Sequence, residues 1–207
     1  FVVVWQSDGS AGSDSDGASI QARPFDAEGN PIGGEFQVNT YTTGAQGLPT
    51  VAMDGLGRFV VAWQSSGSAG SDTGRYSIQA RLFDQHGAPL GDDFQVNTAT
   101  AHQQRRASLA LDESGGFVVA WESATSTGTD TTGYSIQAQR YSAGGTPLGD
   151  PFQVNSFTTG DQHSPDVAIV GLDNFVIAWT SSGSGGDDTS EDSIQARRFA
   201  PNGTPLA

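Results

Sequence analysis

The sequence predicts an all-β fold in which four-stranded antiparallel repeats form a β-propeller-like array, incomplete at both ends. A unit recurs at a spacing of 58 residues without insertion or deletion, and its apolar segments are short and separated by Gly, Pro, Asn and Asp. No segment of ten residues has a helical period. Four strands in about 40–60 residues are typical of a propeller blade. Immunoglobulin-like sandwiches, the main alternative, need about 100 residues and about seven strands per unit.

The second unit illustrates the strands expected in each repeat. A first strand at residues 49–53 is followed by a Gly-containing turn at 54–58 and a second strand at 59–63. This second strand, FVVAW, is apolar on both faces, as expected for a strand that is covered on both sides. After a Gly/Ser/Asp loop, a third strand at 77–84 alternates apolar and polar residues, and a fourth is expected at 94–98.

In this frame the chain is a single repeat domain with a partial unit at 1–48, whole units at 49–106 and 107–164, and a partial unit at 165–207. The first strand of the opening unit and the fourth strand of the closing unit are missing. Unpaired strand edges invite pairing with more chain. We therefore expect further repeats of the same chain, or neighbouring subunits, to complete the array, and we favour a longer chain.

Composition excludes several classes of partner. The formal net charge is −14, with a pI of about 4.2, and the nine basic residues are all Arg. Nucleic acids and anionic membranes require clustered basic residues, so neither is an expected partner. No apolar segment is long enough for membrane insertion. The absence of Cys excludes disulfides and thiolate metal sites.

The long loops after the second and fourth strands are expected on one face, because the connections of a meander alternate between the ends of its sheet. An Asp recurs in every copy of the first of these loops, at Asp14, Asp72, Asp130 and Asp188. Calcium prefers carboxylate and carbonyl oxygens, often on a Gly-bent loop, so these residues are candidate metal ligands. The alternative is that each Asp caps the backbone amides of its own loop.

A glutamine recurs in the loop after the fourth strand, three residues before each first strand, at Gln46, Gln104 and Gln162. Its amide is a candidate ligand-binding group for a sugar hydroxyl or a peptide carbonyl, but it can equally cap backbone groups between blades. Repetition within one chain reflects shared architecture first, which favours the structural role. A tryptophan ends each second strand, and a place in the core is favoured over sugar stacking.

The segments FVVAWQS, SIQAR-x-FD, G-x-PLG-x-x-FQVNT and P-x-VA follow one another in each repeat. In that order they resemble the tandem repeats of very large exported bacterial proteins of the surface-adhesin type. The resemblance implies an extracellular or cell-surface, non-catalytic module that calcium assists. The hemolysin-type Gly/Asp nonapeptide, which often accompanies such repeats, does not occur in this sequence.

No Ser/His/Asp grouping, paired carboxylates or phosphate-binding motif repeats, and the three histidines occupy different positions of the unit. We therefore predict that the chain is not an enzyme but a secreted or cell-surface module with a structural or adhesive role. Two alternatives are a lectin that binds glycan around the recurring glutamines and a subunit of a head-to-tail extracellular assembly. A hydrolase is the least favoured interpretation.

Overall fold

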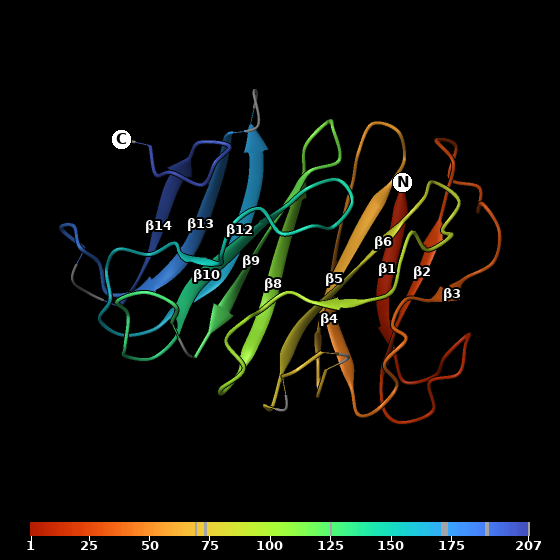
Figure 1. The fold of residues 1–207 in the computed structure, drawn as a ribbon, viewed down its shortest axis with the longest axis horizontal. Coiled ribbons are helices and arrows are strands. Elements are labelled where there is room, and N and C mark those ends of the chain that lie inside the picture. Colours follow the sequence, from red (N-terminus) through yellow and green to blue (C-terminus); the bar gives the residue numbers. More distant parts are fainter. Residues whose placement is uncertain (69, 73, 125, 171–173, 189–190, 207) are drawn as a thin grey trace.

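The computed structural model describes residues 1–207 except 69, 73, 125, 171–173, 189–190 and 207. The described residues form strands and no helix, and so they contain no helix that could cross a membrane. Four antiparallel sheets follow one another in a row, from the red first sheet to the blue last sheet (Figure 1). This arrangement confirms the predicted propeller-like array of four-stranded repeats.

The first sheet contains β1 (Val2–Ser7), β2 (Ser19–Pro24) and β3 (Phe36–Gln37). The second contains β4 (Gln46–Met53), β5 (Phe59–Ser65), β6 (Ser77–Phe83) and β7 (Phe94–Gln95). The third contains β8 (Gln104–Leu111), β9 (Phe117–Ser123), β10 (Ser135–Tyr141) and β11 (Phe152–Gln153). The last contains β12 (Gln162–Val170), β13 (Asn174–Ser182) and β14 (Asp192–Phe199). The turn expected before β13 lies largely at residues 171–173, outside the described residues.

The fourth strand of each unit is shorter than predicted. β7 pairs with β6 only at two positions, Gln95 with Gln79 and Phe94 with Ala80. The ladder then continues with one backbone bond, from Val96 to Ile78. Beyond it a side chain replaces the backbone, because the amide of Ile78 donates to Oδ1 of Asn97 at 2.8 Å. The predicted strand at 94–98 is therefore wrong in length.

The hydrophobic core lies between sheets. Ile78 and Ala80 of the second sheet share one buried cluster with Val119 and Trp121 of the third, and equivalent clusters join the other neighbouring pairs of sheets. The fully buried Trp63 agrees with the core role favoured from the sequence. Packing on both faces explains why the second strand of each unit is apolar throughout.

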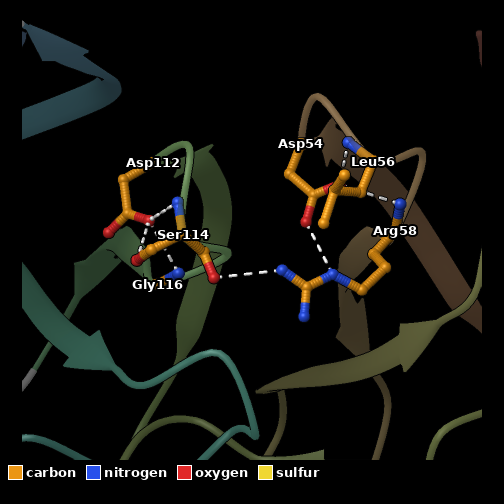
Figure 2. A network of polar contacts seen from close by, with 6 residues as sticks. All are labelled: Asp54, Leu56, Arg58, Asp112, Ser114 and Gly116. Atoms are coloured by element: carbon orange, nitrogen blue, oxygen red, sulfur yellow. Dashed lines mark hydrogen bonds and ion pairs between the residues drawn. The ribbon is translucent and has the colours of Figure 1, made fainter.

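The tight turns between the first and second strands lie at the end opposite the long loops, where hydrogen bonds connect the turn of one sheet to the turn of the next. In Figure 2, Oδ2 of the buried Asp54 accepts from Nε of Arg58 at 2.7 Å, and Oδ1 accepts from the amide of Leu56. Nη2 of Arg58 donates to the carbonyl of Ser114 in the next sheet at 3.0 Å. Asp112 caps that second turn in the same way (Figure 2). These two carboxylates therefore stabilise the turns of the fold.

The innermost strands β4, β8 and β12 contact one another in series. Each contains a β-bulge at the same place, where the pairing with the second strand shifts. The bulge holds a non-glycine residue in the left-handed region, namely Leu48 (φ 51°), Arg106 (φ 51°) or Ser164 (φ 53°). Such a backbone conformation is uncommon for residues other than glycine, and it turns all three side chains toward solvent.

Candidate functional site

Three of the recurring aspartates, Asp14, Asp72 and Asp130, are buried within the loop face, whereas Asp188 is exposed. Each of the three is held by a set of hydrogen bonds that we call the clasp. Oδ1 of Asp72 accepts from the amide of Gly74 at 2.7 Å, and Oδ2 accepts from Nδ2 of Asn97 at 2.7 Å. The amide of Asp72 itself donates to Oε1 of Gln95 at 2.8 Å. The corresponding bonds recur around Asp14 and Asp130. Both carboxylate oxygens of each clasp therefore already accept a hydrogen bond from the protein.

This geometry fits the capping role considered from the sequence. Burial raises the pKa of Asp130 above its ordinary value, although hydrogen bonds from Thr132 and Asn155 act in the opposite direction. No group of three His, Asp or Glu among the described residues could hold a metal ion. Asp188, in the last loop, adjoins residues 189–190 that lie outside the described part. Calcium binding by these loops stays a prediction.

The recurring glutamines lie beneath the loops and are fully buried. Oε1 of Gln104 accepts from Nε1 of Trp121 at 3.1 Å, and its Nε2 donates to the carbonyl of Ala101 at 3.3 Å. Gln162 makes the same two kinds of bond, to Trp179 and Thr159. Nε2 of Gln46 donates to the carbonyls of residues 43 and 44. These amides support the loops, as the structural alternative requires, and face no open surface.

The repeats differ where the innermost strands begin. The two residues after the recurring glutamine are Gly47 and Leu48 in β4, Arg105 and Arg106 in β8, and His163 and Ser164 in β12. The facing position near the end of each second strand also varies. It is occupied in turn by Gln6, Gln64, Glu122 and Thr180. Among these positions, formal charge occurs in the third sheet, at Arg105, Arg106 and Glu122.

Glu122 connects these differing residues. Its fully buried carboxylate accepts from Nε of Arg105 at 2.6 Å and from Nη1 of Arg106 at 3.1 Å. It also accepts from the backbone amide of Ser164 in the next sheet at 2.7 Å. Hydrogen bonds between ionised groups are the strong ones, so Glu122 fixes both guanidinium groups and the bulge of β12 together.

We name the inner-strand cluster by its five members: Arg105, Arg106, Glu122, Ser164 and Asp166. His163 lies outside it, with Nε2 at 3.7 Å from Oδ2 of Asp192. Its guanidinium groups and its carboxylate at Asp166 reach solvent. Oδ1 of Asp166 accepts from Oγ of Ser108 at 2.9 Å. The guanidinium of Arg105 lies 3.9 Å above the ring of Tyr134. The cluster thus combines guanidinium donors held by Glu122 with an exposed carboxylate at Asp166.

This cluster cannot be found among the residues that recur, because its members do not repeat. The sequence does hold a signal for it. Four residues carry formal charge at positions where the other repeats carry none, namely Arg105, Arg106, Glu122 and Asp166. The expected common face of the long loops is confirmed, since the amide of Gln104 donates to the carbonyl of Tyr76 at 2.9 Å.

Comparison with known proteins shows that the fold is that of a β-propeller. No protein-family profile and no curated protein matches the chain. A GH43 endo-arabinanase from Bacillus licheniformis is 15% identical, matches 100% of this chain and 72% of its own length, and has a TM-score of 0.50. At such identity the likeness shows the fold alone, which is that of the GH43 β-propeller.

Two further solved structures are similar at lower scores. An α-L-arabinanase from Cellvibrio cellulosa in complex with arabinohexaose is 7% identical, with 99% of this chain and 72% of that chain covered and a TM-score of 0.48. An α-L-arabinanase from Penicillium chrysogenum in complex with arabinobiose is 14% identical, with 87% and 50% covered and a TM-score of 0.49.

These findings correct two predictions. The chain was expected to be a non-catalytic structural or adhesive module and not an enzyme, yet the endo-arabinanase that shares its fold is a glycoside hydrolase. The two non-catalytic alternatives, a lectin and a subunit of a head-to-tail assembly, are overturned as accounts of function by the same finding. The reason is physical: a site at the centre of a propeller combines single residues from several blades, so no motif needs to repeat. The resemblance to surface adhesins stays a prediction.

Proposed function

We propose that this chain is part of a carbohydrate-active β-propeller that hydrolyses glycosidic bonds and binds its glycan at the inner-strand cluster. The observation that carries the proposal is the gathering of charge at the start of β8 and its bond to the start of β12, at positions where the repeats differ from one another. The fold likeness to a glycoside hydrolase supports it. The extracellular or cell-surface location predicted from the sequence belongs to the proposal, because polymeric glycans are encountered outside cells.

The two carboxylates of the cluster have different environments. Glu122 is buried and held by three donors, so we assign it the role of a positioning residue for Arg105 and Arg106. Asp166 is exposed and is oriented by Ser108. Glycoside hydrolysis uses a pair of carboxylates beside the scissile bond. Asp166 is our candidate for the member of that pair that this chain presents to solvent.

Hydrolysis and binding should be measured separately, with linear arabinan and arabinohexaose as probes. We expect release of reducing ends from arabinan, and a loss of at least about a hundredfold in Asp166→Asn, because a missing acid or base costs about that much. Binding of arabinohexaose, followed by calorimetry, should change little in this variant. Asp92→Asn is the matched control, since Asp92 is an exposed carboxylate on the connection between β6 and β7.

Each outcome separates the parts of the proposal. Binding without hydrolysis would reject the catalytic part and retain a glycan site. Equal activity of Asp166→Asn and the control would remove Asp166 from the reaction. Absence of both binding and hydrolysis across arabinan, xylan and related plant polysaccharides would overturn the proposal.

A further inference from the structure

The two arginines of the inner-strand cluster share a single buried carboxylate. Nε of Arg105 donates to Glu122 at 2.6 Å and Nη1 of Arg106 donates to it at 3.1 Å. The side chain of Glu122 is fully buried, whereas those of Arg105 and Arg106 are 31% and 49% exposed. One carboxylate therefore faces two guanidinium groups, and one positive charge has no paired carboxylate.

Among the acidic side chains that the structure describes, Glu122 alone pairs with these arginines. Asp166, the exposed carboxylate of the cluster, is oriented by Ser108 and forms no salt bridge with either guanidinium. The guanidinium carbon of Arg105 lies 3.9 Å from the centre of the Tyr134 ring. Stacking on a ring uses a face of the planar guanidinium, so the N–H groups along its edge stay available.

Both guanidinium groups keep donors for a ligand. A guanidinium has five N–H groups in a fixed fork, and Glu122 accepts from one nitrogen of each arginine. Within the described part of the chain, their other nitrogens donate to no residue. The left-handed backbone at Arg106 (φ 51°) turns its side chain toward solvent. The donors that remain are therefore held in place by Glu122 and are accessible.

A carboxylate is the ligand group that fits this arrangement. Its two oxygens match the paired N–H groups of a guanidinium edge, and such charged hydrogen bonds are stronger than neutral ones. A single carboxylate also balances the single unpaired charge of the cluster. A phosphate monoester carries close to two negative charges, which exceeds that unpaired charge.

The remainder of the chain limits the number of carboxylates on the ligand. The formal net charge is −14 and no lysine is present, so the chain as a whole repels polyanions. The paired arginines occur in the third sheet alone, because the equivalent positions hold Gly47 and Leu48 in the second sheet and residues 163–164, His and Ser, in the fourth. One isolated acidic group on a neutral ligand is therefore favoured over a ligand with many.

We propose that the inner-strand cluster recognises a uronic acid unit carried by an otherwise neutral glycan. Arg105 and Arg106 bind the carboxylate of that unit and determine specificity, while Glu122 positions their guanidinium groups. This inference rests on the proposed function and deepens it, because it names the class of glycan that the site selects.

Calorimetry with a matched pair of ligands tests the proposal. The pair consists of a xylo-oligosaccharide that carries one glucuronate and the same oligosaccharide without it. We expect the acidic ligand to bind at least about tenfold more tightly, because a hydrogen bond to a charged group contributes about that factor or more. Added NaCl should reduce the difference by screening. Oligogalacturonate, which carries a carboxylate on every unit, should bind more weakly than the singly charged ligand.

Arg106→Gln should abolish the preference for the acidic ligand. This substitution removes the unpaired charge, while Glu122 keeps its bonds to Arg105 and to the amide of Ser164. Arg23→Gln is the matched control, because it removes the same charge from a guanidinium that donates to the carbonyl of Gly33 outside the cluster. The control should keep the preference, and far-UV circular dichroism checks that both variants are folded.

Release of reducing ends is followed in the same samples, so that binding and hydrolysis are measured separately. Equal binding of the two xylo-oligosaccharides would overturn the inference, and hydrolysis of either one would still support the proposed function. Loss of the preference in the Arg23→Gln control, or tighter binding of oligogalacturonate, would also overturn the inference. A preference for the acidic ligand without hydrolysis would support the inference and reject the catalytic part of the proposed function.

Discussion

Removal of the Asn97 side chain should destabilise the second sheet strongly. Its Oδ1 accepts from the amide of Ile78 at 2.8 Å, and its Nδ2 donates to Oδ2 of Asp72 at 2.7 Å and to the carbonyl of Ala99 at 2.8 Å. Asn97 is buried, so water cannot take over these bonds in Asn97→Ala. The substitution therefore leaves a buried amide and a buried carboxylate each short of a partner.

The magnitude follows from the type of each bond. A neutral hydrogen bond contributes about 1 kcal/mol and a bond to a charged group about 2 kcal/mol. Loss of the three bonds of Asn97 should therefore lower the free energy of unfolding by about 4 kcal/mol. In a chain of this length, 1 kcal/mol corresponds to about 2–4 °C in Tm, so we expect Tm to fall by about 8–16 °C.

Urea denaturation and thermal melting measure this change, with Asn30→Ala as the matched control. Nδ2 of Asn30 donates to Oδ2 of Asp26 at 3.0 Å, but this pair is exposed. The control should stay within about 0.5 kcal/mol of the wild type. A loss of less than about 1 kcal/mol in Asn97→Ala, or a loss no larger than that of the control, would refute the view that the clasp holds the loop face.

Three further predictions concern burial, calcium and pH. Ile136→Ala should cost about 2–5 kcal/mol by thermal unfolding, while Ile194→Ala at the same position of the last sheet should cost less than about 0.5 kcal/mol; equal losses would contradict the difference in burial. If the loop aspartates bind calcium as the sequence predicts, a hundredfold excess over Kd should stabilise the chain by about 2.7 kcal/mol relative to EGTA. Asp72→Asn should reduce that gain, and identical melting in both buffers would leave these residues as caps. Burial raises the pKa of Asp130 above 3.8, so its contribution to stability is fully present below that value and is lost as the pH rises through the folded-state pKa. Because Asn does not titrate, the free energy of unfolding of Asp130→Asn minus that of the wild type should increase as the pH rises through this window. A constant value would contradict the raised pKa of Asp130.

Much of the fold could be predicted because its determinants are local in sequence. The spacing of 58 residues and the apolar run at 59–63 predict strands that are buried on both faces, and β5 confirms this. The fourth strand could not be predicted in length. Whether Asn97 continues a ladder with its backbone or ends it with its side chain depends on the position of Asp72, which is brought beside it by the fold.

The candidate site required the tertiary structure for a related reason. Glu122 lies 17 and 16 residues from Arg105 and Arg106 along the chain, and 42 residues from Ser164. These separations match no motif, because the contacts arise from the pairing of β8 with β9, the bulge at Arg106 and the packing of one sheet on the next.

The sequence by itself determined the repeat, the class of fold and the turns, since each depends on the alternation of apolar residues and on residues near in the chain. The tertiary structure decided which repeated residues are buried supports and which single departures from the repeat meet. Gln104 recurs yet supports a tryptophan beneath the surface, whereas Glu122 occurs once and organises the inner-strand cluster. Local patterns encode strands, but a site between sheets depends on distances that only the packed sheets define.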